Sequence, residues 1–418
     1  MKAAKILIGL IIALYVGFFL VGQFLPKTTS MARSIEINAS PQVVFSFVGT
    51  QKSQQAWSPW AEYDKEMKVN FAGEPIGVGA TMNWQSEHPK VGIGSSVVTL
   101  YEPYERIDVT LQFGQHSAGN ASIQLQALSE DAVKVTWTYS TRHDNLFEKY
   151  FGLMLDGMLG AEYEKGLAKL KTMAEAAPTI TTRVFEYTVE GTTLTGYIAE
   201  PRGNLDNIPA VLVVHEWWGH NEYARKRADM LAELGYVAMA IDMYGDGKLA
   251  DHPEDAKKFM MEVGANTALA GERFDAALTI LAAQPGVSPL DIAAIGYCFG
   301  GSVVLNMARA GKPLKGVASF HGGLGGLLPV SHLSKAKQLI LNGAADPMIS
   351  AEDIESFKTG SAEQGVEFEF VNYPGAKHAF TNPSATELGE KYGLPLAYDE
   401  QADKESWARL VDFLSSIF

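Results

Sequence analysis

The chain contains a single cysteine among its 418 residues, and this scarcity excludes several kinds of site. Cys298 cannot close a disulfide within the chain, and one thiol cannot supply the CxxC or Cys/His spacing of a zinc site. We therefore predict neither a metal site nor a bound cofactor. Cys298 is either a packing residue or a reactive group.

Positive charge is also scarce. Thirty-four Lys and Arg residues stand against 48 Asp and Glu residues, which gives a formal net charge of −14. Such a chain repels a phosphate backbone instead of neutralising it. Nucleic acid is therefore excluded as an expected partner.

The length and hydrophobicity predict a multidomain globular chain. Hydrophobic residues make up 47% of the 418 residues and charged residues 20%. At about 150 residues per domain, this length predicts two to three domains. We divide it into residues 1–30, 31–176 and 182–418, with an Ala/Pro/Thr linker around Pro178.

The first segment contains an uncharged apolar run from Ile6 to Leu25. At about 1.5 Å per residue, a helix of this length spans a hydrocarbon core of roughly 30 Å. The run predicts a single-pass membrane anchor. The alternative is a cleaved signal peptide, for which Ser30 and Ala32 provide small residues at a suitable spacing.

Basic residues flank both ends of this run. Lys2, Lys5 and the terminal amine precede it, whereas Lys27 and Arg33 follow it. The slight excess in front favours an amino terminus on the cytoplasmic side. We therefore expect the folded domains on the non-cytoplasmic side of the membrane.

Residues 31–176 alternate polar and apolar side chains over several short runs, which predicts an antiparallel sheet. A long amphipathic helix follows, with apolar positions from Phe151 to Leu170 that would lie across the concave face of the sheet. The expected strands are 34–38, 79–84, 95–100, 106–113, 121–127 and 133–139. A sheet wrapped around a helix in this way leaves a cavity between them.

This order of elements resembles the polyketide cyclase/dehydrase branch of the START-like (SRPBCC) helix-grip superfamily. The similarity rests on Trp57-Ser-Pro-Trp60, the glycine-rich segment 73–79 and the glycines of the closing helix. It implies an α+β helix-grip domain that binds a hydrophobic ligand. Trp57, Trp60, Trp84 and Trp137 either line such a pocket or are ordinary core and rim aromatics.

Residues 182–418 alternate short apolar runs with helical segments. The expected strands are 184–187, 193–199, 211–214, 237–241, 292–295, 338–341 and 368–371, and the expected helices are 223–234, 254–263, 272–283, 302–310, 351–363 and 406–418. This alternation predicts a parallel sheet with helices on both faces.

One junction in this array carries a chemical signature. Gly296-Tyr297-Cys298-Phe299-Gly300 follows an apolar strand and precedes a helical run. The pattern G-x-C-x-G stands where α/β-hydrolases carry G-x-S-x-G, on a sharp strand-to-helix turn. We therefore predict that Cys298 is a nucleophile.

The partners of such a nucleophile should follow it in the order acid, then histidine, each just beyond a strand. Asp346 follows the expected strand 338–341, and His378 follows the expected strand 368–371. Taken alone, each is an ordinary turn residue, but their order and placement predict a Cys-His-Asp triad. His215 and His220 compete for the role of base, although they precede Cys298.

Residues from about 183 to 418 resemble the dienelactone hydrolase family, which shares the G-Y-C-F-G-G sequence and the segment Val213-Val-His-Glu-Trp-Trp-Gly219. The resemblance implies an α/β-hydrolase fold and a carboxylic ester hydrolase in which Cys298, Asp346 and His378 are catalytic. It further implies that Glu216 contacts the resting thiol and that the N–H groups of Trp217 and Phe299 form the oxyanion hole. The alternative for Glu216 is a rim carboxylate beside Arg225 or Arg227.

The expected substrate is a small ester or lactone. Family members hold a substrate carboxylate with arginines, and Asn382 occupies the position of one of them, while Lys257 and Arg273 are uncertain substitutes for the other. Dienelactone itself is therefore doubtful. Two other functions remain open: a lipid-binding protein with a degenerate hydrolase domain, or a cyclase or dehydrase coupled to the hydrolase.

Overall fold

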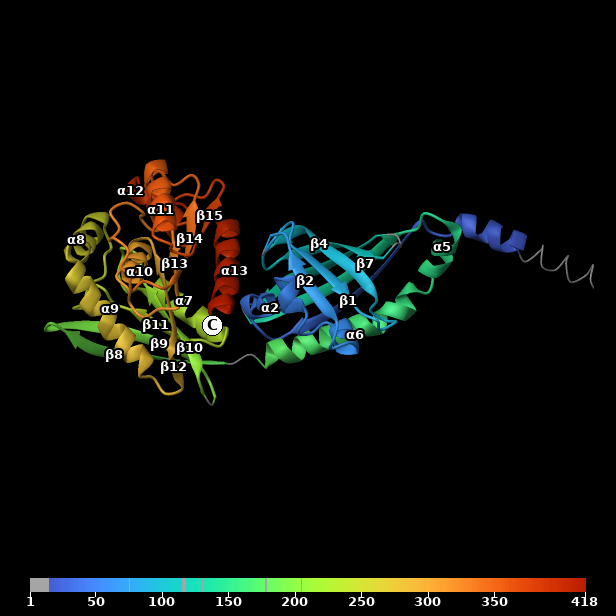
Figure 1. Cartoon of the computed structure of the whole chain (residues 1–418), viewed down its shortest axis with the longest axis horizontal. Helices are drawn as coiled ribbons and strands as arrows, with labels where there is room; N and C mark the ends of the chain where they lie inside the picture. The colour runs from blue at the N-terminus through green and yellow to red at the C-terminus, as the bar shows by residue number, and fades with distance from the viewer. Residues whose placement is uncertain (1–14, 75, 115–117, 130, 177–178, 204) are drawn as a thin grey trace, which may run out of the picture. The chain divides into compact units, whose positions relative to one another are not determined.

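A computed structural model of the chain divides into two compact units, Met1–Ala176 and Ala177–Phe418 (Figure 1). It describes residues 15–74, 76–114, 118–129, 131–176, 179–203 and 205–418. The predicted linker position Pro178 and the first part of the predicted anchor, residues 6–14, lie outside the described residues.

The first unit is an antiparallel sheet of seven strands in the order β1-β7-β6-β5-β4-β3-β2. Its strands are β1 (Thr28–Ile37), β2 (Lys68–Ala72), β3 (Thr81–Gln85), β4 (Ile93–Glu102), β5 (Arg106–Phe113), β6 (Gly119–Ser129) and β7 (Ala132–Arg142). Its named helices are α2 (Pro41–Val48), α3 (Gln51–Gln54), α4 (Pro59–Tyr63), α5 (Leu146–Gly152) and α6 (Leu155–Glu175).

The long helix α6 packs against β1 and β7, as the sequence pattern predicts. Alternate residues of β7 are buried, including Val133, Val135, Trp137 and Tyr139, because successive side chains of a strand point to opposite faces. Tyr163 of α6 stacks on Trp137, with ring centroids 3.9 Å apart. These contacts hold the helix across one face of the sheet.

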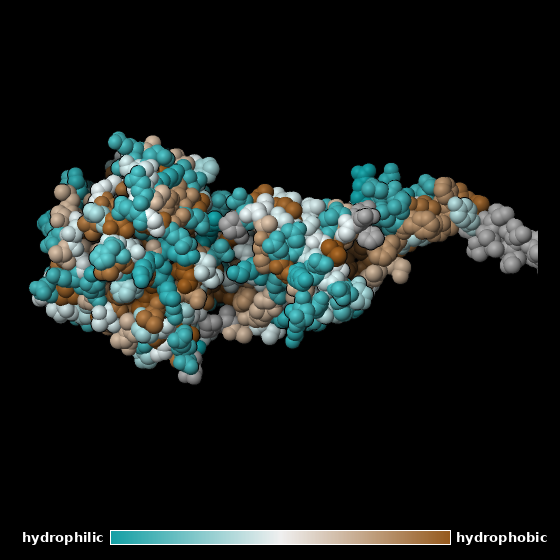
Figure 2. Space-filling model, in the orientation of Figure 1, coloured by the Kyte–Doolittle hydropathy of each residue, from teal (hydrophilic) through white to brown (hydrophobic). Residues whose placement is uncertain are grey.

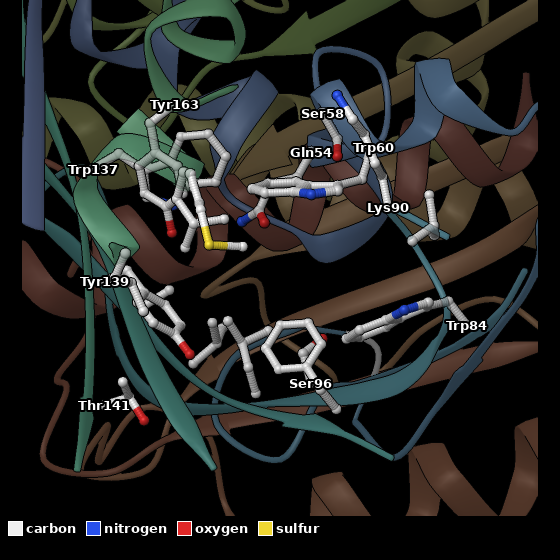
Figure 3. Close-up of a pocket in the computed structure, with 18 of the residues that line it drawn as sticks. Gln54, Ser58, Trp60, Trp84, Lys90, Ser96, Trp137, Tyr139, Thr141 and Tyr163 are labelled. Atoms are coloured by element: carbon white, nitrogen blue, oxygen red, sulfur yellow. The ribbon is translucent and has the colours of Figure 1, made fainter. Parts of the chain in front are cut away.

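A cavity of about 740 Å³ lies between the sheet and the helices of the first unit. All four tryptophans named from the sequence are among its lining residues. Figure 3 shows the rings of Trp137 and Tyr163 on one side of the cavity and those of Trp60 and Trp84 on the other. The lining is therefore dominated by aromatic and aliphatic side chains.

Residues 15–24 form a helix whose apolar side chains are largely exposed, as Figure 2 shows. This helix contacts α5: the Tyr150 hydroxyl donates to the Phe18 carbonyl at 2.7 Å, and the Lys149 Nζ donates to the Gly22 carbonyl at 3.1 Å. Within the described ranges, no helix is both long enough and apolar enough to cross a bilayer.

The second unit is built on a sheet of eight strands in the order β15-β14-β13-β12-β10-β11-β9-β8. The strands are β8 (Ile180–Val189), β9 (Thr192–Pro201), β10 (Ile208–Val214), β11 (Val237–Ile241), β12 (Val287–Tyr297), β13 (Gly316–Phe320), β14 (Lys337–Gly343) and β15 (Phe368–Tyr373). The six strands from β10 to β15 pair in parallel.

The predicted parallel sheet is confirmed only for these six strands, because the sheet as a whole is mixed. The expected strands 184–187 and 193–199 lie within β8 and β9, which form a hairpin, and β9 then pairs antiparallel with β11. A hairpin joined by a tight turn can only place its two strands antiparallel. The two pairings extend the parallel sheet by two antiparallel strands at one edge.

Helices cover both faces of this sheet, as predicted (Figure 1). They are α7 (Glu222–Glu233), α8 (Pro253–Gly264), α9 (Thr267–Ala282), α10 (Phe299–Arg309), α11 (Ala351–Glu363), α12 (Ala385–Tyr392) and α13 (Glu400–Ile417). Contacts join α9 to α10, whereas Arg227 of α7 pairs with Asp403 of α13. The strand β13 and the helix α12 were missing from the predicted elements.

Candidate active site

The nucleophile candidate sits on a strained turn between β12 and α10. Cys298 has a φ of 52° and a ψ of −114°, in a region that L-residues rarely adopt. A side chain at Gly296 would collide with the backbone of Gly300, and one at Gly300 would collide with the backbone of Val214. The two glycines therefore allow the close packing that holds the Cys298 thiol at the carboxyl end of the sheet.

The structure brings Cys298, His378 and Asp346 together in one chain of contacts. The His378 Nε2 lies 3.1 Å from the Cys298 Sγ, and the His378 Nδ1 lies 2.7 Å from the Asp346 Oδ2. Asp346 follows β14 and His378 follows β15, so neighbouring parallel strands deliver both side chains to the same edge. Asp346 is also fixed by the Met348 N–H, which donates to its Oδ1 at 2.8 Å.

The electrostatics of this chain favour a charged histidine. Burial, the largest single influence on His378, opposes its charged form, but the Cys298 thiolate and the Asp346 carboxylate outweigh it. Together they raise the pKa of His378 to about 10. His378 is 4% exposed, so water screens these charges weakly. The arrangement can therefore hold a protonated His378 between the other two side chains.

Glu216 lies two residues beyond β10 and is 2% exposed. Its Oε2 accepts a hydrogen bond from the Asn382 Nδ2 at 2.6 Å, and its Oε1 is buried without a partner among the described residues. Burial raises the pKa of Glu216 to about 7, although the Asn382 hydrogen bond opposes the shift. The hydrogen bond of the thiol in this structure goes to His378.

The two residues named for the oxyanion hole come from two different strand ends: Phe299 directly follows Cys298 after β12, and Trp217 lies in the segment after β10. Phe299 is the first residue of α10, and the first N–H groups of a helix have no acceptor within that helix. Trp217 follows Glu216, and its carbonyl accepts from the Tyr244 hydroxyl at 3.1 Å. That bond fixes the carbonyl group of Trp217.

Two other sequence candidates, His215 and Arg273, have structural roles. The His215 Nε2 accepts from the Met243 N–H at 3.1 Å, and burial lowers the pKa of His215. Arg273, considered for a substrate carboxylate, instead donates to the carbonyls of Met243 and Tyr244. In the described ranges, no group of three His, Cys, Asp or Glu side chains is arranged to hold a metal ion.

One histidine beside Cys298 was missed in the sequence. His321 directly follows β13, is fully buried, and accepts through Nδ1 from the Cys298 N–H at 3.1 Å. Its position just beyond a strand, in Phe320-His321-Gly322-Gly323, is the same signal that identified Asp346 and His378. The strand itself, Gly-Val-Ala-Ser-Phe, was not recognised.

A strained strand-turn-helix junction on an open sheet that is parallel through its centre is the architecture of an α/β hydrolase. Residues 194–418 match the model of the dienelactone hydrolase family, and residues 28–175 match the model described as polyketide cyclase / dehydrase and lipid transport. The chain belongs to the dienelactone hydrolase family and carries a START-like domain in front of it, so both resemblances are confirmed.

Relatives and solved structures agree with this family. A protein of Aquifex aeolicus (strain VF5) named "Putative carboxymethylenebutenolidase" is 26% identical over 239 residues, which is 56% of this chain and 98% of that protein. A dienelactone hydrolase-like promiscuous phosphotriesterase from metagenomic libraries is 33% identical, with a TM-score of 0.53, over 57% of this chain and 99% of that one. The structure named m3DLH is 34% identical, with a TM-score of 0.54 over the same shares. The prediction of an enzyme of this family is confirmed.

Proposed function

We propose that the second unit hydrolyses esters or lactones through a Cys298-His378-Asp346 triad. The observation that carries the proposal is the continuous chain from Sγ to Nε2 and from Nδ1 to the Asp346 carboxylate, placed on a strained turn. An intact set of three partners in the order nucleophile, acid, histidine argues against a degenerate scaffold.

In this mechanism His378 holds the proton of Cys298, and the thiolate attacks the carbonyl carbon. The N–H groups of Trp217 and Phe299 stabilise the oxyanion of the tetrahedral intermediate. The C–O bond then breaks as His378 donates its proton to the departing alkoxide, leaving a thioester on Cys298. His378 next takes a proton from water, whose oxygen attacks the thioester carbonyl. The C–S bond then breaks, so that the carboxylic acid leaves and Cys298 returns as a thiolate beside the protonated His378. Asp346 orients the ring throughout.

The substrate is expected to lack a carboxylate. Asn382 is neutral, and its amide is already bonded to Glu216, while Arg273 is engaged by two backbone carbonyls. An anionic acyl group would find no free cation among these residues. At a pH above about 7 it would also be repelled by the ionised Glu216 carboxylate. Neutral esters and lactones are therefore the substrates that this site favours.

The test uses the full chain with p-nitrophenyl esters of increasing acyl length, a neutral lactone, a carboxylated lactone and a phosphotriester. Intact-mass analysis after acid quenching should show one acyl group on the wild-type chain and none on Cys298→Ala. Equal hydrolysis rates in both proteins would disprove the triad. Faster turnover of the carboxylated lactone than of its neutral counterpart would instead overturn the argument from Asn382.

For the first unit we propose a hydrophobic ligand in the aromatic cavity. The cavity of about 740 Å³ is lined mainly by apolar side chains, and burying apolar surface contributes roughly 25 cal/mol per Å². Native mass spectrometry of the full chain should show a bound lipid that is lost when Trp137 is replaced by Ala. The absence of any bound or acquired apolar ligand would refute this role.

We also propose that the apolar run Ile6 to Leu25 anchors the chain in a membrane, with the folded units on the non-cytoplasmic side. The exposed apolar side chains of residues 15–24, among them Phe19, Leu20 and Phe24, support this proposal because water is a poor surrounding for them. Carbonate extraction tests the anchor, and protease treatment of a separate sample of sealed inside-out vesicles tests the side. Release by carbonate would disprove the anchor, and digestion only after these vesicles are disrupted is the result expected for the proposed side.

A further inference from the structure

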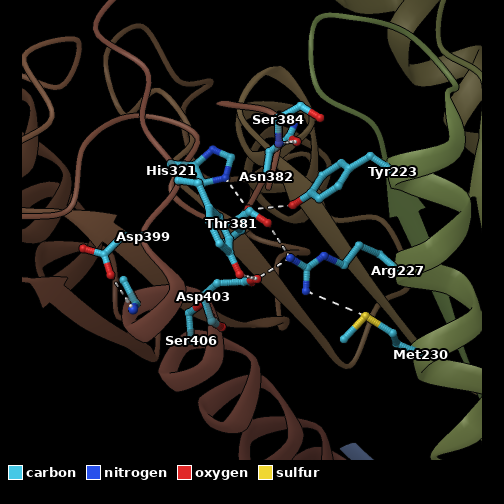
Figure 4. Close-up of polar contacts among 12 residues, drawn as sticks. Tyr223, Arg227, Met230, His321, Thr381, Asn382, Ser384, Asp399, Asp403 and Ser406 are labelled. Atoms are coloured by element: carbon cyan, nitrogen blue, oxygen red, sulfur yellow. Dashed lines mark hydrogen bonds and ion pairs between the residues drawn. The ribbon is translucent and has the colours of Figure 1, made fainter. Parts of the chain in front are cut away.

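A chain of polar contacts links Cys298 to the loop that carries His378. Figure 4 shows the part of it that runs from His321 through Thr381 to Tyr223 and Arg227. The Cys298 N–H lies 2.9 Å from the Phe320 carbonyl and 3.1 Å from the His321 Nδ1. On its other side, the His321 Nε2 lies 2.7 Å from the Thr381 hydroxyl, which in turn lies 2.6 Å from the Tyr223 hydroxyl. Thr381 is only three residues beyond His378.

The hydrogen bonds fix the tautomer of His321. Since the Nδ1 accepts from a backbone N–H, the proton of a neutral ring is on the Nε2, which donates to Thr381. Burial, followed by the charge of His378, lowers the pKa of His321 well below its usual value, which agrees with the geometry. The rings of His321 and His378 have centroids 5.4 Å apart, so two charged rings would repel each other.

The far end of the chain is anchored independently of the Thr381 hydroxyl. The Arg227 Nη2 donates to the Thr381 carbonyl and to the Asp403 Oδ1, both at 2.6 Å. Arg227 is 4% exposed and lies against the rings of Tyr223, Tyr297 and Trp407. Removal of the hydroxyl therefore leaves the backbone of Thr381 with its own partners.

We propose that His321 and Thr381 are positioning residues that set the distance between the Cys298 thiol and His378. His321 holds the backbone of the nucleophile, Thr381 holds His321, and Thr381 belongs to the same loop as His378. The pair thus links both reacting side chains of the triad without touching the substrate. This inference rests on the proposed triad and adds two residues to the machinery around it.

The experiment measures ester hydrolysis and the alkylation of Cys298 by iodoacetamide from pH 5 to 9 in the full chain. Alkylation needs no known substrate, and Cys298 is the only thiol. Thr381→Val removes the hydroxyl at nearly constant shape, whereas Thr381→Ser keeps it. His321→Asn keeps an acceptor near the position of Nδ1 but cannot reach Thr381. Thr279→Val, on the exposed side of α9, is the matched control.

We expect Thr381→Val to lower kcat about tenfold with little change in KM, since small misplacements of reacting groups are costly. The alkylation profile should shift toward higher pH, because a misplaced His378 stabilises the thiolate less. His321→Asn should have a similar effect, and the double variant should be no worse than either single one. Thr381→Ser should restore most of the activity, and Thr279→Val should behave as wild type.

Three results would overturn the proposal. The first is an unchanged kcat and alkylation profile in Thr381→Val. The second is an equal loss in Thr381→Ser and Thr381→Val, which would exclude the hydroxyl. The third is a lower melting temperature with unchanged rates, which would indicate a structural role only. If wild-type Cys298 itself titrates like an ordinary free thiol, the proposed triad fails before the positioning pair is tested.

Discussion

The two units of the chain use buried space in opposite ways. In the second unit, polar side chains near Cys298 pair with one another, through Asp346, His378, His321, Thr381 and Asn382. In the first unit, the cavity is lined by aromatic rings that contact each other, such as those of Trp57 and Trp137, whose ring centroids are 5.0 Å apart. The paired polar groups of the second unit indicate one type of reaction, whereas the apolar cavity of the first unit indicates only that its ligand is hydrophobic.

The largest expected effect is the loss of ester hydrolysis when Cys298 is replaced, which should affect the second unit alone. Cys298→Ala should reduce ester hydrolysis at least about 10⁴-fold, because the covalent route is lost. Ligand binding in the first unit should be unchanged. Parallel measurement of kcat/KM and of ligand retention by native mass spectrometry checks this prediction. If both properties were lost together, the units would not be functionally distinct.

A smaller loss is expected for Asp346→Asn, which keeps the shape of the side chain but not its charge. The amide cannot stabilise a charged His378, so we expect kcat to fall roughly 10³-fold. Asp255→Asn, on the exposed first turn of α8, is the control and should retain wild-type rates. A loss of less than about threefold for Asp346→Asn would mean that His378 is oriented by other groups.

In the first unit, Trp137→Ala should destabilise the fold by about 3–5 kcal/mol, because it removes a ring that packs on Tyr163 and Trp57. Calorimetry of the full chain should show only one of two transitions moving to lower temperature. Hydrolysis of a small ester should be unaffected below that transition. Phe147→Ala, at a position 76% exposed, should change stability by no more than about 0.5 kcal/mol.

The last prediction concerns the pH dependence of stability in the second unit. The pKa of Glu216 is about 7 in the folded chain, compared with 4.5 for an ordinary glutamate. The folded state therefore binds this proton more tightly, and stability falls as the pH rises from 4.5 to 7. Above pH 7 the ionised Glu216 lowers the free energy of unfolding by about 3 kcal/mol.

Glu216→Gln should remove this loss of stability, because the side chain no longer ionises. The glutamine oxygen can still accept the hydrogen bond from Asn382. We expect the free energy of unfolding of the variant to exceed that of wild type by an amount that grows between pH 5 and pH 7, in urea titrations at fixed temperature. Contributions from other titrating groups cancel in the difference between the two proteins. A constant difference across this range would show that Glu216 does not change its charge there.

The sequence was most informative where a strand pattern and a chemical residue coincide. Cys298, Asp346 and His378 each follow an apolar run, and the structure places the His378 ring within hydrogen-bonding reach of both other side chains. His321 follows β13, whose small residues gave no clear apolar pattern, so both were overlooked. The contact between Glu216 and Asn382 joins residues 166 positions apart, and no local pattern encodes it.

The sheet of the second unit shows a different limit. Both strands of the hairpin were expected from their alternation of polar and apolar residues. That alternation does not determine which other strand of the sheet the hairpin pairs with. The pairing of β9 with β11 is a tertiary choice, and it makes the sheet mixed. In the first unit, β2 was missed because Lys68–Ala72 is short and mostly exposed, so it lacks the buried positions that mark a strand.

The crowding at the turn around Cys298 has a consequence for mutational tolerance. Side chains at Gly296 and Gly300 would meet backbone atoms, and one at Gly301 would lie 2.6 Å from the Ser319 hydroxyl. Backbone cannot move aside as a flexible side chain can. A saturation library over these positions should therefore return glycine almost alone at 296 and 300, even in a screen for folding that ignores activity.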